Sequence, residues 1–255
     1  MILAIDVGNT NITLGGFENE RITFVSRFST SNPKTADEFA VCILNALSLH
    51  NVNKDEVSGV IVASVVPPVN TALKKAIKVV FRNEALFVGP GIKSGISIQC
   101  DIPSSVGADI IASSVAVHDL YGSPALIVDI GTATKMTVLN HNGAFIGTSI
   151  IPGILMGLNA LSENTAQLPK ISLEVPQKVI AKNTSDCMRS GVLFGNASLI
   201  DGMIDRINEE YGEKLKVYAT GGSAESIIPL CKHDITVDEH LVLKGLNIIY
   251  HKNRD

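Results

Sequence analysis

Leu3-Ala-Ile-Asp-Val-Gly-Asn-Thr-Asn11 is repeated in pattern by Leu126-Ile-Val-Asp-Ile-Gly-Thr-Ala-Thr134. In each stretch an apolar run leads to an aspartate, an apolar residue, a glycine and three small residues. Asp6 matches Asp129 and Gly8 matches Gly131 at one constant offset. Both stretches continue into alternating apolar and polar residues with turns at 18–20 and 141–143. Such alternation predicts hairpin strands, and a repeat found once over half the chain predicts a duplicated domain.

The residues after each hairpin unit predict helices and further strands. In the first half, Thr35-Ala-Asp-Glu38 has the capping-box pattern that opens a helix to about Leu49. A strand at 57–65, a helix at 70–81 and a strand at 85–88 follow. For the second half we predict helices at 154–162 and 184–210, a strand at 215–219, a helix from 223, a strand at 235–237 and a helix at 241–251.

Tyr-Gly-Ser-Pro at 121–124 interrupts the pattern between the two copies, so we expect two domains, 1–120 and 121–255. Two ββαβ-type halves facing each other would form a cleft. This α/β fold class, with duplicated ribonuclease-H-like halves, is the architecture of the actin-like ATPase superfamily. We therefore expect a protein that handles ATP.

Composition excludes several other classes. Hydrophobic residues make up 45% of the 255 residues and charged residues 18%, which excludes a disordered chain. A net charge of −4, without a basic cluster interleaved with aromatics, argues against nucleic-acid binding. The apolar run 148–161 is too short and too interrupted to span a membrane. With no targeting signal after Met1, and four cysteines in no CxxC motif, we expect a cytoplasmic protein with reduced thiols.

The acidic glycine turn has the chemistry of a phosphate site. Gly8 permits a tight turn, and the amides and hydroxyls of Asn9, Thr10 and Asn11 can donate to phosphate oxygens. Asp6 is placed to hold Mg²⁺ directly or through water. A single such turn is equally well explained as ordinary hairpin punctuation, but two copies in register favour two loops facing a triphosphate.

Two further features are ambiguous when taken alone. Gly221-Gly222 follows a predicted strand and would let a nucleobase approach the backbone, but a plain strand-to-helix turn explains it nearly as well. Asp109 opens an apolar helix, where a carboxylate also stabilises the helix N-terminus. Local chemistry alone favours the capping role for Asp109.

A set of motifs nevertheless stands in a specific order and spacing. They are Asp6-Val-Gly-Asn-Thr10, Gly107-Ala-Asp109, Asp129-Ile-Gly-Thr132, Pro152-Gly153, Lys182-Asn-Thr184 and Gly221-Gly222. Over almost the whole chain this set closely resembles the type III pantothenate kinases. The resemblance implies Mg²⁺-dependent phosphorylation of pantothenate by ATP to 4'-phosphopantothenate, the first step of coenzyme A biosynthesis. It also implies a homodimer, whose interface we expect at the apolar segments 150–161 and 184–210.

The resemblance also implies a role for each matched residue. Asp109 is expected to be the catalytic base, and Asp129 to bind a monovalent cation, potassium or ammonium. ATP is expected at Asp6, Val7, Gly8, Asn9, Thr10, Asn11, Thr132, Gly221 and Gly222, and pantothenate at Gly107, Ala108, Asp109, Ile110 and Thr184. The half 1–120 would carry the first phosphate turn and the base, and 121–255 the second phosphate turn, the adenosine-side glycine pair and the dimer interface.

The sequence departs from the family pattern near the substrate. Ile110 stands where arginine is common, Cys100-Asp-Ile-Pro103 replaces Tyr-x-Asn-Pro, and Lys135 follows the second turn where threonine is usual. Because pantothenate carries a carboxylate, Lys135 and Arg189 are candidate replacement cations. Two alternatives stay open: a non-catalytic nucleotide-binding or regulatory homologue, and a kinase of another small hydroxyl substrate.

Overall fold

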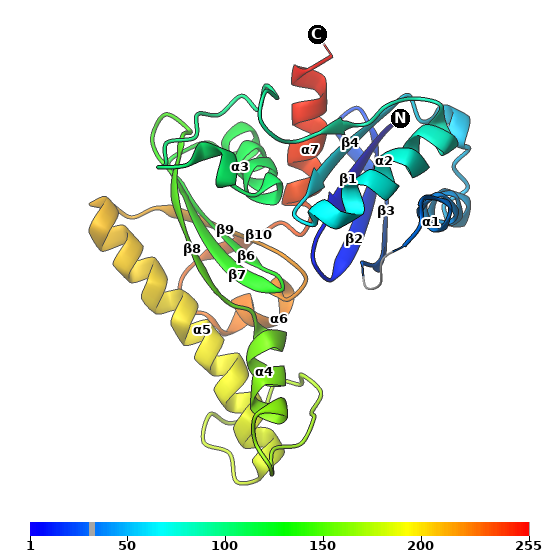
Figure 1. The fold of residues 1–255 in the computed structure, drawn as a ribbon. Helices are drawn as coiled ribbons and strands as arrows, with labels where there is room; N and C mark the ends of the chain where they lie inside the picture. The colour runs from blue at the N-terminus through cyan, green and yellow to red at the C-terminus, as the bar shows by residue number, and fades with distance from the viewer. Residues whose placement is uncertain (31–33, 255) are drawn as a thin grey trace. The chain divides into compact units, whose positions relative to one another are not determined.

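The computed structural model describes residues 1–30 and 34–254, and the chain forms two compact units, drawn in Figure 1. The first unit contains Met1–Tyr121 and Leu241–Asp255, and the second contains Gly122–His240. The sheet of the first unit has the order β3-β2-β1-β4-β5. Its strands are β1 (Ile2–Val7), β2 (Asn11–Glu18), β3 (Arg21–Ser29), β4 (Gly59–Ser64) and β5 (Leu86–Phe87).

The sheet of the second unit repeats this topology. Its strands are β6 (Ala125–Ile130), β7 (Ala133–Leu139), β8 (Phe145–Pro152), β9 (Lys216–Thr220) and β10 (Ile235–Val237), in the order β10-β9-β6-β7-β8. β1 and β6 each pair antiparallel with the next strand in sequence and parallel with the fourth strand of their own unit. The predicted α/β class with duplicated halves is therefore confirmed strand by strand.

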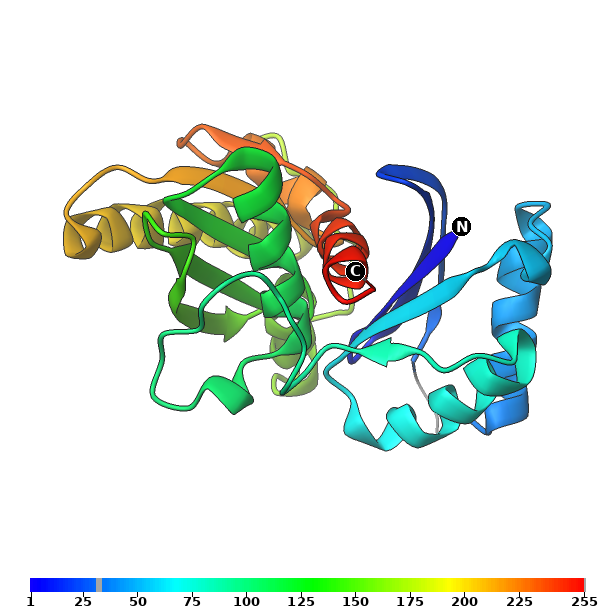
Figure 2. The same ribbon diagram turned by 90° about the horizontal axis from the view of Figure 1, so that it is seen from above.

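Helices cover both faces of the first sheet. They are α1 (Ala36–Leu49), α2 (Pro67–Phe81), α3 (Ala108–Tyr121) and α7 (Leu241–Lys252). Successive side chains of a strand point to opposite faces, so Leu3 and Ile5 of β1 pack in one apolar cluster with α1 and α2. Ile2 and Ala4 pack in another cluster with α3 and α7. Figure 2 shows α7 on the opposite side of this sheet from α1 and α2.

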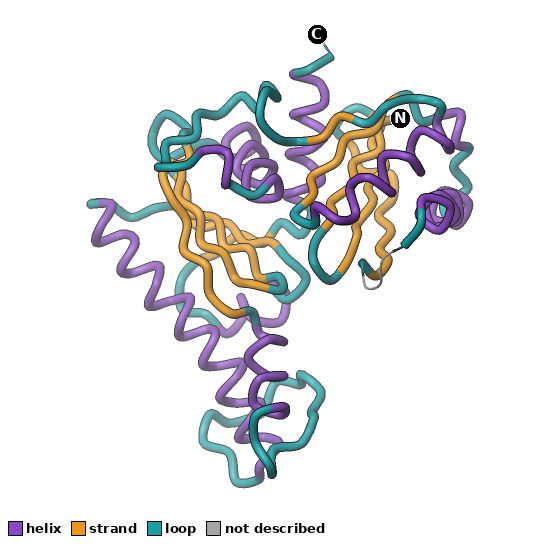
Figure 3. Tube along the Cα trace, viewed as in Figure 1, coloured by secondary structure: helices purple, strands orange, loops and turns teal. Residues whose placement is uncertain are grey.

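One apolar cluster joins the second sheet to α4 (Ile154–Glu163), α5 (Thr184–Tyr211) and α6 (Ala224–Ile227). Leu126 and Val128 of β6 belong to it, together with Leu158 of α4 and Leu193 of α5. The long irregular segment 164–183 joins α4 to α5 (Figure 3). This segment is anchored because Leu168, Ile171 and Leu173 pack against the same cluster.

The helix ends that local sequence signals predicted lie close to the observed ones. The hydroxyl of Thr35 accepts a hydrogen bond from the Glu38 amide, and the Glu38 carboxylate accepts one from the Thr35 amide, so the predicted capping box is confirmed. Hydrogen bonds that the Thr35 amide and hydroxyl donate to the Glu38 carboxylate lower the pKa of Glu38. Helix α2 begins at Pro67 instead of at residue 70, because Pro67 and Pro68 occupy its first positions, where no backbone donor is needed. Short 3₁₀ helices lie at Lys54–Glu56, Pro103–Ser105 and Ile228–Leu230.

The end of the chain differs from the predicted halves. We expected 121–255 to form one half, but α7 belongs to the first unit, where it packs along α3. A Cβ atom on Gly245 of α7 would overlap the backbone of Ala112 in α3. The two helices therefore approach more closely than any side chain at position 245 would allow. Within the described residues, no helix is both long and apolar enough to cross a membrane.

Replacing Gly245 with alanine tests this packing. Gly245→Ala should destabilise the protein by roughly 1–3 kcal/mol or more, because the added methyl group overlaps rigid backbone. Gly202→Ala in α5 is the matched control, since a Cβ there meets nothing within 4 Å, and it should be neutral or stabilising by up to about 1 kcal/mol. Urea unfolding of both variants measures the difference, and equal stability would contradict the close α3–α7 approach.

Candidate functional site

The first turn lies between β1 and β2 and is closed by backbone hydrogen bonds. The amide of Gly8 donates to the carbonyl oxygen of Asn11 at 3.0 Å. Thr30, directly after β3, adds two bonds: its amide donates to Thr10 at 2.9 Å and its hydroxyl donates to the Gly8 carbonyl at 2.8 Å. A Cβ on Gly8 would lie 3.2 Å from the Asn11 oxygen, so the turn favours glycine.

The predicted phosphate ligands of this turn differ in their exposure. Asn9, Thr10 and Asn11 are exposed, and Asp6, near the end of β1, is half-buried. These side chains are accessible to a ligand from solvent. Val7 is fully buried in the apolar cluster beneath the turn, so only its backbone is available.

Asp109 lies in the first turn of α3, close to the same strand ends. The Val7 carbonyl accepts a hydrogen bond from the Val65 amide at 3.1 Å. A Cβ on Gly107 would lie 3.6 Å from a methyl carbon of Val65 and 2.5 Å from the Asp109 carboxylate. Gly107 therefore has to be glycine for the carboxylate to occupy its place, and Val65 links this segment to the first turn. The first unit thus brings together the predicted base and the predicted phosphate turn.

The neighbours of Asp109 serve the fold. Its Oδ1 accepts a hydrogen bond from the Ile110 amide at 2.8 Å. Ala108 and Ile110, both predicted to contact pantothenate, are buried. Because the Ile110 side chain belongs to the buried interior, this position supplies no cation where the family commonly has arginine.

The second turn, between β6 and β7, is closed differently from the first. The Gly131 amide donates to the carbonyl of Ala133, and the Gly153 amide donates to the carbonyl of Thr132, both at 3.2 Å. A Cβ on Gly153 would collide with the carbonyl oxygens of Gly131 and Thr132. Pro152-Gly153 therefore has a structural role in holding the turn, and it leaves the Thr132 side chain exposed.

Asp129 is enclosed by two neighbours. Lys135 is its register partner on β7, and its ammonium nitrogen lies 2.7 Å from Asp129 Oδ2. Gly221 has a φ of 96°, and a Cβ there would lie 2.6 Å from Asp129 Oδ1 and 2.6 Å from the Ile130 oxygen. Gly221 is therefore part of the second turn's packing, a role that its sequence pattern did not reveal. Gly222 beside it is exposed.

Thr184 and Arg189 lie in the first turns of α5. Asn183 caps the helix by accepting from the Asp186 amide at 2.9 Å, and Thr184 is exposed. Arg189 donates to Asp186 at 3.0 Å and to the carbonyl of Ser172 at 3.1 Å. Hydrogen bonds from Asn183 and Arg189 hold the pKa of Asp186 below its usual value. Arg189, a candidate cation for the acceptor's carboxylate, therefore ties the irregular segment to α5.

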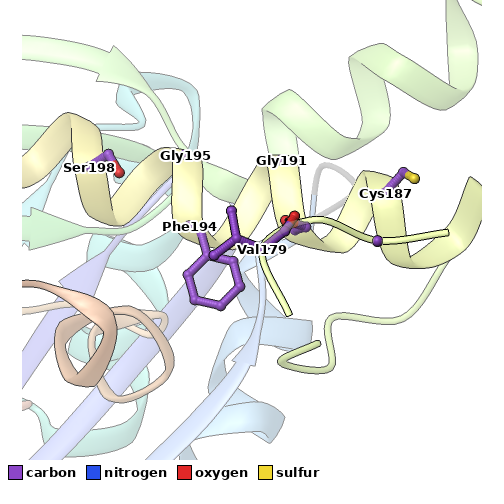
Figure 4. A pocket seen from close by; sticks show the side chains of 8 residues that line it. Val179, Cys187, Gly191, Phe194, Gly195 and Ser198 are labelled. Atoms are coloured by element: carbon purple, nitrogen blue, oxygen red, sulfur yellow. The ribbon is translucent and has the colours of Figure 1, made fainter. Parts of the chain in front are cut away.

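A shallow pocket follows Thr184 along α5, and the sequence did not predict it. It measures about 450 Å³ and lies between α5 and residues 179–181 (Figure 4). Most of its lining residues are small, and they include Val179, Cys187, Gly191, Phe194, Gly195 and Ser198. All four cysteines are free thiols. Cys187 is exposed, whereas burial and nearby Asp201 raise the pKa of Cys231 to about 11.

Asp6 fits the Mg²⁺ ion that the sequence predicts there, but Asp129 does not fit the predicted monovalent cation. Within residues 1–30 and 34–254, no three histidine, cysteine or acidic side chains are grouped as a metal site. Mg²⁺ bound to phosphates needs only one or two protein carboxylates, and half-buried Asp6 beside the first turn fits that need. The Asp129 carboxylate is instead paired with an ammonium group, so it does not fit a second cation.

Comparisons with known proteins identify the same family that the order of the motifs resembles. Residues 2–206 match the family model described as type III pantothenate kinase. The chain is 39% identical over 253 residues to the type III pantothenate kinase of Halalkalibacterium halodurans, covering 99% of this chain and all of that protein. It is also 39% identical over 255 residues to the one of Geobacter sulfurreducens, with full coverage of both chains.

Solved structures show likeness of fold alone. A conserved putative Baf family transcriptional activator from Campylobacter jejuni superposes with a TM-score of 0.64 at 19% identity, over 99% of this chain and 98% of that one. The activator of 2-hydroxyisocaproyl-CoA dehydratase from Clostridium difficile, with bound ADPNP, gives 0.59 at 14% identity over 98% and 93%. A putative N-acetylglucosamine kinase from Porphyromonas gingivalis gives 0.54 at 14% identity over both whole chains.

The packing of Gly221 against the second turn can be tested by adding one methyl group. Gly221→Ala should lower the melting temperature and weaken binding of a fluorescent ATP analogue, because the Cβ meets Asp129 and Ile130 at a positive φ. Gly147→Ala on β8, where a Cβ meets nothing within 4 Å, is the control and should change neither. If the two variants behaved alike in both measurements, Gly221 would have no special role in the turn.

Proposed function

Because the chain belongs to the type III pantothenate kinase family, we propose that it transfers the γ-phosphoryl group of ATP to the primary hydroxyl of pantothenate. The product, 4'-phosphopantothenate, is formed in the first step of coenzyme A biosynthesis. The observation that carries this proposal is full-length similarity to two curated pantothenate kinases, in a chain that keeps an aspartate at both phosphate turns and at position 109.

Phosphoryl transfer requires positioning and charge stabilisation more than covalent chemistry. Asp109 orients the acceptor hydroxyl and takes its proton. The exposed Asn9, Thr10 and Asn11 donate to the phosphate oxygens of ATP from the first turn. Mg²⁺ held by Asp6, directly or through water, supplies charge neutralisation when it is bound.

The other predicted contacts divide into two groups. Thr132 and the backbone at Gly221-Gly222 contact ATP, and the segment from Gly107 to Ile110, with Thr184, borders the acceptor. Ala108 and Ile110 are buried, so their contribution is to hold Gly107 and Asp109 in place. The resemblance also predicts potassium or ammonium at Asp129. We assign that ion no step, because Lys135 already pairs with this carboxylate.

A homodimer is the second part of the proposal. Ile150 on β8 and Leu155 and Met156 on α4 are 67%, 55% and 49% exposed, and Ile180 is 84% exposed. This concentration of apolar surface favours a protein partner, and a second copy of the chain is the partner that the family implies. The helix α5 contributes differently from the expectation: none of its large apolar side chains is exposed, and it presents the small residues of the pocket instead.

A cytoplasmic location is the third part. Four free cysteines, one of them exposed, suit a compartment that keeps thiols reduced. ATP, the phosphoryl donor, is also a cytoplasmic metabolite.

The role of Asp109 is tested by removing its charge. Asp109→Asn should keep the fold but lower pantothenate phosphorylation by about 100-fold or more, as loss of a positioned base does. Asp37→Asn is matched to it, since Asp37 is exposed in the first turn of another helix of the same unit, and its turnover should stay within about twofold.

A coupled ATP-consumption assay with a panel of hydroxyl acceptors, combined with a measurement of ATP binding, tests this variant and separates the alternatives. Consumption with pantothenate supports the proposal. Consumption only with another acceptor identifies a different kinase, and ATP binding without turnover identifies a non-catalytic homologue. Undiminished phosphorylation by Asp109→Asn would remove Asp109 from the mechanism.

The dimer is tested by placing charge on the apolar surface. The double variant Leu155→Asp, Met156→Asp should shift sedimentation at micromolar concentration from dimer to monomer, because buried unpaired carboxylates oppose association. Leu49→Asp, on α1 and 77% exposed in the first unit, should remain dimeric. A wild-type monomer, or a double variant that still dimerises, would refute this interface.

A further inference from the structure

A partly buried ion pair lies beside the second phosphate turn. The Lys135 ammonium lies 2.7 Å from Asp129 Oδ2, and the two side chains are only 16% and 17% exposed. Ion pairs that are exposed to solvent contribute little to folding stability, but this pair is largely shielded from water. The charge of Asp129 is therefore compensated within the chain.

The backbone fixes this pairing. Asp129 and Lys135 are directly opposite each other on antiparallel strands β6 and β7, where facing Cβ atoms lie about 4.5–5.5 Å apart. Each of the two strands also pairs with a further strand along its other edge, β6 with β9 and β7 with β8. Neither residue belongs to a loop that could swing away, so the ammonium is held where the sheet places it.

The remaining carboxylate oxygen is also enclosed. Oδ1 of Asp129 faces Gly221, where even a Cβ would lie at 2.6 Å, and it lies 3.6 Å from the place of a Cβ on Gly131. A further monovalent cation on this carboxylate would have to stand close to the lysine charge in a poorly solvated place. Like charges repel strongly at such separations when water is excluded.

Lysine carries the same charged group as an ammonium ion, a compact centre with several donors. We propose that the Lys135 ammonium takes the place of a dissociable monovalent cation at the second phosphate turn, so that ATP use by this chain is independent of potassium and ammonium. The proposal rests on the proposed kinase function. Lys135 acts as a positioning residue: it orients and neutralises Asp129, which would otherwise repel a triphosphate.

The first test compares cations. Wild-type pantothenate phosphorylation should have the same kcat and KM for ATP, within about twofold, in potassium, sodium and choline chloride at equal ionic strength. Lys135→Thr should lose at least about tenfold in kcat/KM for ATP in choline, and potassium or ammonium should restore most of it, since a vacated carboxylate can then bind the ion. Lys216→Thr, an exposed lysine of β9 in the same sheet, should respond like the wild type.

The second test does not require turnover. Binding of a non-hydrolysable ATP analogue, measured by calorimetry with Mg²⁺ present, should be insensitive to potassium in the wild type and should become potassium-dependent in Lys135→Thr. Failure to phosphorylate pantothenate while this binding pattern holds would refute the proposed function and leave the cation inference supported. If Lys135→Thr does not fold, Lys135→Met keeps the apolar stem without the charge.

The wild type alone is also decisive. A wild-type enzyme that needs potassium or ammonium for ATP binding or turnover overturns the proposal, whatever the variants do. Potassium-independence of both wild type and folded Lys135→Thr would overturn it too, because the lysine would then replace nothing.

Discussion

Backbone pairing along both edges of β1 and β6 is the constraint on which the rest of this protein depends. Each strand has an antiparallel neighbour on one side and a parallel neighbour on the other. The pairing on both sides therefore fixes the backbone position of the aspartate near the end of each strand. The chain then leaves the strand through a tight turn. The pairing positions Asp6 and Asp129 in the same way and fixes what can stand beside them.

The two turns start from one pattern but close with different chemistry. At the first, the Thr30 side chain reaches across and donates to Gly8. At the corresponding place after β8 stands Gly153, whose backbone approaches the turn so closely that no side chain fits. The second turn is consequently more tightly packed, and it is also the one whose aspartate carries a lysine partner. Duplication conserved the strand geometry and left the environment of each aspartate to diverge.

The succession of strands and helices along the chain could be predicted from the sequence because alternation, turn residues and a capping box are local signals, and the structure confirms it. Contacts between distant residues could not be read in this way. The packing of Gly221 on Asp129 depends on the parallel pairing of β6 with β9. Arg189 was a candidate substrate cation, and its hydrogen bond to the carbonyl of Ser172 in the irregular segment was not predicted. The membership of α7 in the first unit depends on a backbone contact at Gly245 that no periodicity encodes.

The unequal environments of the two aspartates imply a division of labour in handling a triphosphate. A carboxylate near phosphates is repulsive unless a cation stands between them or neutralises it. Asp6 suits a cation that arrives with the nucleotide, since its turn has exposed polar side chains around it. Asp129 is compensated by Lys135 before any nucleotide binds. Because the lysine is part of the strand, its charge is preorganised and costs no ordering when ATP enters. On the proposed function, a metal requirement would then concentrate at the first turn, where we propose that Mg²⁺ binds together with the phosphates.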